Sequence, residues 1–175
     1  MNTPSFKTLT ETLNYLEERH HKIVHRGLRA MYDLVREVAA WEDPNLQQQL
    51  LKPLFHFCKV LKLELDHHMT MEEEIVFPLI RNLETAQKAD LPPSGRGLAN
   101  YYLKHLVHEH EVILHTLHQI RQLSADYQLP FNAPPGLKEL YDQIRFLHSD
   151  LDEHLHFEST YLFPQVDKLE AGKYE

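Results

Sequence analysis

Hydrophobic residues recur every three to four positions along most of the chain, which is the spacing of an amphipathic helix. Three clusters of helix-breaking residues, at 41–45, 90–95 and 129–136, interrupt this pattern and divide the chain into four segments. None of the segments alternates as a β-strand would. Long amphipathic helices with short connections predict one all-α domain over residues 1–175, an antiparallel up-down-up-down four-helix bundle. The expected helices cover approximately residues 8–41, 46–86, 96–127 and 135–168.

Polar residues interrupt each hydrophobic stripe at positions where the helical spacing calls for core residues. The second and fourth segments carry a His-x3-Glu pair there, and the first and third carry a histidine. A buried, unpaired carboxylate costs several kcal/mol, so these side chains need a compensating charge. A pair of divalent cations would supply it. The candidate metal ligands are His21, His68, Glu72, His110, His154 and Glu158.

The four candidate histidines are expected at one height of the bundle. Residues equidistant from the turn of a helical hairpin face each other, and the midpoints of successive histidines fall within the three breaks. They should lie within about one helical turn, or ~5 Å. The stretch His-x3-Glu-x4-Phe-Pro that begins at His68 recurs 86 residues later at His154. The chain is therefore predicted to repeat one hairpin pattern twice, each copy supplying a histidine and a His-x3-Glu pair.

Four imidazoles and two carboxylates suit two metal ions better than one. This donor set favours iron, with manganese and zinc as alternatives, over calcium or magnesium, which prefer oxygen ligands alone. If both glutamates bridge the ions and each ion takes two histidines, each ion has about four bonds to protein. An oxo or hydroxo bridge would add another, which leaves a coordination position for a small molecule.

Composition and charge exclude several other classes of function. The formal net charge is −8 with no basic cluster, which disfavours nucleic-acid binding. A single cysteine, Cys58, excludes an internal disulfide, a cysteine-ligated zinc site and a self-contained iron–sulfur cluster. The N-terminal residues contain no apolar signal region and no segment suggests a membrane span, so a cytoplasmic protein is expected.

The remaining acidic and histidine residues offer weaker candidates. At ~100° per residue, His20 lies off the ligand direction. His25 lies one turn beyond His21 on the same face and is a candidate ligand, proton relay or supporting residue. Glu17 and Asp150 could accept the second N–H of a ligand imidazole. A ferritin-like Glu-x2-His pattern also occurs twice, at Glu64 and Glu153, but it is out of register with the repeat and is less favoured.

The doubled motif resembles the hemerythrin-like (HHE cation-binding) four-helix bundles, and among them the di-iron domain of the repair-of-iron-centres proteins. The resemblance runs from about Thr8 to Leu169. It implies two iron ions with the four histidines as terminal ligands and with Glu72 and Glu158 as bridging carboxylates. It also implies that Glu64 and Glu109 line the route to the iron pair.

The resemblance implies a role in iron handling and in defence against nitric oxide and oxidants. Iron–sulfur client proteins, an electron donor, and O2 or NO as small ligands are the partners it implies. The sequence lacks the family's N-terminal Cys-Cys domain, which weakens the expectation of full repair activity. It also lacks the His-x3-His spacing of oxygen carriers on its second and third helices. Alternatives are an O2-, NO- or redox-sensing module without turnover, and a metal-free structural bundle.

Overall fold

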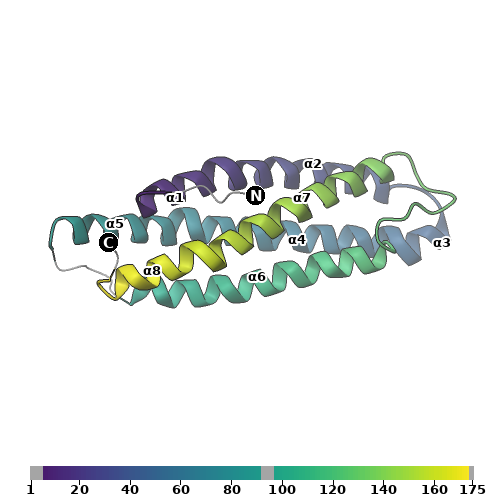
Figure 1. The fold of residues 1–175 in the computed structure, drawn as a ribbon. Helices are drawn as coiled ribbons and strands as arrows, with labels where there is room; N and C mark the ends of the chain where they lie inside the picture. Colours follow the sequence, from purple (N-terminus) through teal and green to yellow (C-terminus); the bar gives the residue numbers. More distant parts are fainter. Residues whose placement is uncertain (1–5, 92–96, 174–175) are drawn as a thin grey trace.

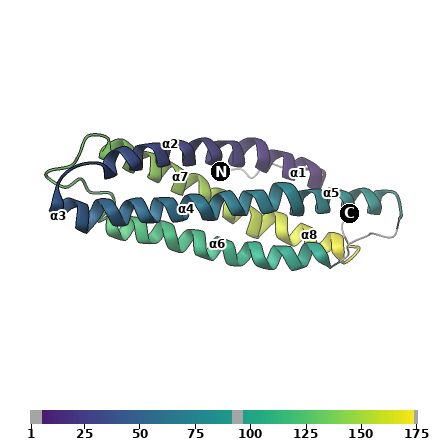
Figure 2. The same cartoon turned by 180° about the vertical axis from the view of Figure 1, so that it is seen from behind.

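The computed structural model describes residues 6–91 and 97–173, which form helices joined by turns and loops, and no strand occurs among them. The described helices group into four long rods, and these rods lie side by side in Figure 1. The first rod packs on the fourth through α2 (Lys22–Ala39) and α7 (Leu137–Phe157). The second packs on the third through α4 (Lys52–Met71) and α6 (Leu98–Leu123), and α2 also contacts α4. The view from behind shows the same neighbours (Figure 2). The expectation of an all-α fold is confirmed.

The first two rods are built from helices interrupted by wider π-helical turns. Asp43 caps the start of the second rod, since its carboxylate accepts the N–H groups of Asn45 and Leu46. The first rod comprises α1 (Leu9–Leu16), the π turn η1 (Glu17–His21) and α2 (Lys22–Ala39). The second comprises α3 (Pro44–Leu46), η2 (Gln47–Leu51), α4 (Lys52–Met71), η3 (Glu72–Val76) and α5 (Phe77–Lys88).

The third rod is one continuous helix, α6 (Leu98–Leu123). It ends before the predicted boundary near residue 127 because the backbone at Ala125, Asp126 and Tyr127 adopts positive φ angles of 48°, 60° and 63°. A right-handed helix cannot continue through that region. The fourth rod comprises α7 (Leu137–Phe157), η4 (Glu158–Leu162) and α8 (Phe163–Glu170).

Two separate hydrophobic cores fill the bundle, one at each end. One contains residues from α2, α4, α7 and the second half of α6; the other contains residues from α1, α5, α8 and the first half of α6. On the first rod the change from one core to the other falls between Leu16 and Val24. On the fourth it falls between Leu155 and Leu162. The buried histidines and glutamates occupy the layer between the two cores.

None of the helices in the described part of the chain combines the length and the apolar character needed to cross a lipid bilayer.

Candidate metal centre

The middle layer of the bundle brings together all six residues that the sequence singled out. The imidazole rings of His21 and His154 lie 5.0 Å apart between centroids, and those of His68 and His110 lie 4.9 Å apart. None of the four histidine residues is more than 5% exposed. The remaining two residues, Glu72 and Glu158, are completely buried.

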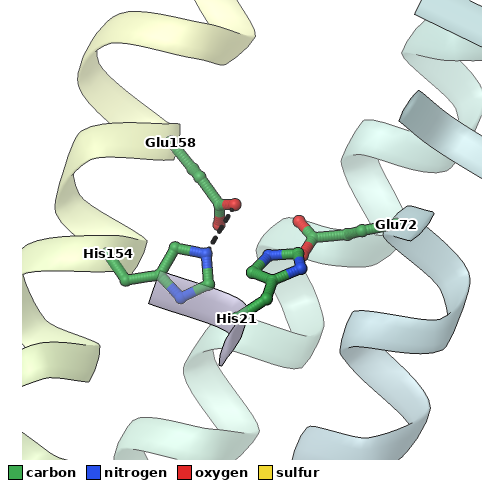
Figure 3. Close-up of side chains that lie close together, drawn as sticks. All are labelled: His21, Glu72, His154 and Glu158. Carbon is green, nitrogen blue, oxygen red and sulfur yellow. Dashed lines mark hydrogen bonds and ion pairs between the residues drawn. The ribbon is translucent and has the colours of Figure 1, made fainter. Parts of the chain in front are cut away.

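These side chains form two groups that share both carboxylates. The first group consists of His21, His154, Glu72 and Glu158, and Figure 3 shows the two carboxylates reaching toward the two rings from opposite sides. In the second group His68 and His110 join the same two glutamates. The candidate ligand atoms within each group all lie within 4.8 Å of one another.

Most of the polar atoms at the centre of the layer lack hydrogen bonds. The Nε2 atoms of His21, His68 and His110 are buried without a hydrogen-bond partner, as are both carboxylate oxygens of Glu72. His21 Nε2 lies 3.2 Å from a Glu72 oxygen, but the contact lacks hydrogen-bond geometry. Leaving such atoms unpaired costs about 1–3 kcal/mol each. Converging imidazole and carboxylate lone pairs are the donor set of iron, manganese or zinc, so these residues fit a pair of such cations.

Three of the four imidazoles direct Nδ1 to an acceptor outside the centre. His21 Nδ1 lies 2.7 Å from Glu73, and His68 Nδ1 lies 2.9 Å from Glu109. The corresponding contact of His110 is with the Ser159 hydroxyl, at 3.4 Å. An acceptor at Nδ1 fixes the ring orientation and keeps Nε2 free for a metal ion.

The Phe-Pro ending of the repeated motif supports the histidine of the neighbouring rod. The Phe77 ring stacks on His21 with centroids 5.5 Å apart, and the Phe163 ring stacks on His110 at 5.7 Å. The prolines that follow, Pro78 and Pro164, are the second residues after the π turns η3 and η4. A proline has no N–H to continue the regular hydrogen-bond ladder, so the helix opens into a wider turn before it.

Each charged group in the layer stabilises the charged form of its neighbours. Burial by itself would lower the pKa of His21, but the contacts with Glu72 and Glu73 outweigh it and raise the pKa to about 10. The pKa of His68 is raised for the same reasons, burial being outweighed by Glu72 and Glu109. Burial disfavours the Glu158 carboxylate, yet the nearby histidines hold its pKa well below the usual range. Cations would replace these protons, so metal binding competes with protonation.

Five further candidates from the sequence lie outside the six central residues, and their surroundings differ. They are Glu17, His25, Glu64, Glu109 and Asp150. Glu109 touches His68, as described above, and also lies 3.4 Å from the more exposed His67. The Asp150 carboxylate lies 3.3 Å from His20 and 2.9 Å from Arg19.

The other three face partners outside the six central residues. Glu17 pairs with Arg81 at 2.9 Å, Glu64 accepts a hydrogen bond of 2.9 Å from Thr116, and His25 lies 3.7 Å from Glu73. Neither of the two groups of candidate ligands includes His25.

Glu73, Ser159 and His20 were not among the sequence-derived candidates. The 86-residue shift of the repeat relates Glu73 to Ser159, so the match of the two hairpins could have found them. The sequence placed His20 off the ligand direction, either in solvent or as a supporting residue. It lies in the π turn η1, is only 3% exposed and stacks on His154, so it is not in solvent.

Residues 12–93, which span the first hairpin, match the Hemerythrin HHE cation binding domain family. This part of the chain is similar to a hemerythrin-like domain, as the resemblance seen in the sequence had indicated. Three of the six central residues of this chain, His21, His68 and Glu72, lie within the matched range.

Similar proteins from several bacteria carry the name iron-sulfur cluster repair protein. DnrN of Neisseria gonorrhoeae is 24% identical over 155 residues, covering 89% of this chain and 89% of that protein. ScdA of Staphylococcus haemolyticus is 25% identical, covering 86% of this chain but 64% of its own length. YtfE of Dickeya chrysanthemi is 34% identical over 104 residues, covering 59% of this chain and 42% of that protein. The chain thus spans most of the first relative but less than two thirds of the other two.

Proposed function

We propose that this chain is a non-haem di-iron protein of the cytoplasm that handles iron during nitric oxide or oxidative stress and serves the repair of iron–sulfur clusters. The observation that carries the proposal is the pair of histidine groups that share two fully buried carboxylates. The match to a cation-binding family and the names of the relatives support iron and repair.

In this proposal each ion is held by two histidines from different rods and by both glutamates. One ion would lie with His21 and His154, the other with His68 and His110. The two hairpins would act as repeats in an up-down-up-down bundle, each contributing one histidine and one His-x3-Glu pair. When bound, the ions would supply redox chemistry and a coordination position for O2 or NO; manganese or zinc would bind to the same donors.

The protein's own contribution is to hold the donor atoms in place and to keep water away from them. The two hydrophobic cores close the layer from both ends of the bundle. Glu73 and Glu109 are the points where this layer approaches solvent, since their side chains are 36% and 25% exposed. We propose that a small molecule, or iron on its way to an iron–sulfur client, passes near these two side chains.

Metal analysis of protein purified without oxygen tests the proposal. We expect about two iron ions per chain, and we expect Glu72→Ala and Glu158→Ala to lose most of the metal. Glu111→Ala is the matched control, because this glutamate lies on α6 beside His110 with a side chain that is 74% exposed. A chain that takes up none of Fe(II), Mn(II) and Zn(II) would overturn the proposal.

The stress-related part of the proposal needs a second measurement. Iron-loaded protein titrated with NO under optical and EPR detection should change its spectrum, and the loaded protein should return iron to an apo iron–sulfur client. Stable, reversible adducts without iron transfer would instead identify a sensing module.

A further inference from the structure

The fourth histidine of the centre lacks the support that the other three have. His154 Nε2 lies 2.8 Å from Glu158, toward the shared carboxylates, while its Nδ1 is buried and has no hydrogen-bond partner among the described residues. Figure 3 shows that this second nitrogen points away from both carboxylates. By contrast, Nδ1 of His21, His68 and His110 each faces a carboxylate or a hydroxyl.

The neighbour of His154 explains the difference. The His20 ring stacks face to face on His154, with centroids 5.1 Å apart and an angle of 14° between the planes. The Nδ1 atom of His20 faces Asp150 instead, at 3.3 Å. His20 directly precedes His21, and the residue that directly precedes His110 is Glu109. The Glu109 carboxylate does accept the imidazole N–H of His68. His20 stands at the position that matches Glu109, and its stacked ring offers no acceptor to the Nδ1 atom of His154.

This difference should affect the affinity for a metal ion. A neutral imidazole that binds a cation through Nε2 carries its proton on Nδ1. For His68 that N–H is received by Glu109, whereas for His154 it would be buried without an acceptor. Loss of such an outer acceptor typically weakens metal affinity by about 10–100-fold.

We propose that the two ions are held unequally. The position formed by His68 and His110 fills first and retains its ion, and the position formed by His21 and His154 is the exchangeable one. The inference rests on the proposed di-iron function and deepens it: the exchangeable ion is the one that the protein can give up to a client.

Anaerobic titration of the metal-free protein with Fe(II), against a competing chelator, tests the inference. The wild-type chain should bind two ions in steps that differ by about 10–100-fold in affinity. His154→Ala should keep the tighter step, whereas His110→Ala should lose it. Equal steps in the wild-type chain, or a tighter step that survives His110→Ala and vanishes in His154→Ala, would overturn the inference. Failure to bind Fe(II) at all would count against the di-iron function itself.

A gain of affinity provides a sharper test. His20→Gln offers an amide oxygen to His154 Nδ1 and an amide N–H to Asp150, and should strengthen the weaker step. Glu109→Leu is the matched variant, since it deprives His68 of its acceptor and should weaken the tighter step. Circular dichroism establishes that both variants fold. A folded His20→Gln protein whose weaker step is unchanged contradicts the role given to the missing acceptor. If this variant does not fold, the titrations of His154→Ala and His110→Ala decide.

Discussion

Glu84 and Glu170 occupy matching positions at the ends of the two hairpins, and each carboxylate accepts N–H groups from the start of the neighbouring rod. Glu84, on α5, binds the amides of Leu9 and Thr10 at 3.0 and 3.1 Å. Glu170, on α8, binds the amides of Gly97 and Ala99 at 3.0 and 3.1 Å. The first N–H groups of a helix have no partner within it. Each hairpin is therefore closed by a cap that comes from its other rod.

Removal of the first of these caps should destabilise the fold. Glu84→Ala leaves buried amides unpaired and removes the 2.6 Å hydrogen bond from the Thr10 hydroxyl, so a loss of about 1–3 kcal/mol is expected. Urea unfolding of the metal-free protein measures it. Glu153→Ala is the control, because this residue is exposed on α7 and should change stability by less than about 0.5 kcal/mol. Equal effects of the two substitutions would show that the cap contributes nothing.

The Glu84 cap should also depend on pH. Burial tends to raise the pKa of Glu84, but hydrogen bonds from Thr10 and from the Leu9 amide, together with Lys88, lower it below the usual value. A pKa lowered by folding contributes stability that is present above the unfolded-state value of about 4.3 and is lost as pH falls through the folded-state pKa. The difference in unfolding free energy between wild type and Glu84→Gln should therefore shrink below about pH 4. A difference that stays constant from neutral pH to pH 3 would contradict this.

The arrangement of the rods and of the central layer follows from features that are visible in the chain. Hydrophobic spacing and breakers indicate the helices, and counting from the turns brings His21, His68, His110 and His154 to one height because antiparallel rods rise at the same rate. The surroundings of the centre were harder to predict. A π turn shifts the direction of the residues around it, so a regular helical wheel does not predict that His20 is buried and stacked on His154.

The C-terminal end of α6 could not be predicted from the sequence either. The chain turns at positive φ angles through Ala125, Asp126 and Tyr127, and none of these residues is a glycine that would announce such a turn. Acceptors on neighbouring rods, such as Glu73 for His21, depend on how the rods are rotated against each other, and only packing determines that.

Phe77 should be more important for stability than any exposed aromatic residue. Its side chain is fully buried and stacks on His21, so Phe77→Ala should cost about 3–5 kcal/mol. Phe131, in the link between α6 and α7, is fully exposed and serves as the control, with an expected change below about 0.5 kcal/mol. Thermal unfolding followed by circular dichroism separates the two. A small effect at Phe77 would mean that the ring is not held against the imidazole in solution.

Metal binding should stabilise the folded chain by an amount that grows with the logarithm of the free metal concentration. The donor atoms converge only in the folded bundle, so ions bind the native state and contribute about 2.7 kcal/mol at a free concentration 100 times the Kd. Removal of the metal with a chelator should lower the Tm of the wild-type protein, and the Tm should recover when Fe(II) is added back. In Glu72→Ala or Glu158→Ala the chelator should have almost no effect, because each glutamate belongs to both cation-binding groups. An equal chelator-induced shift in these variants would place the stabilising ion elsewhere in the molecule.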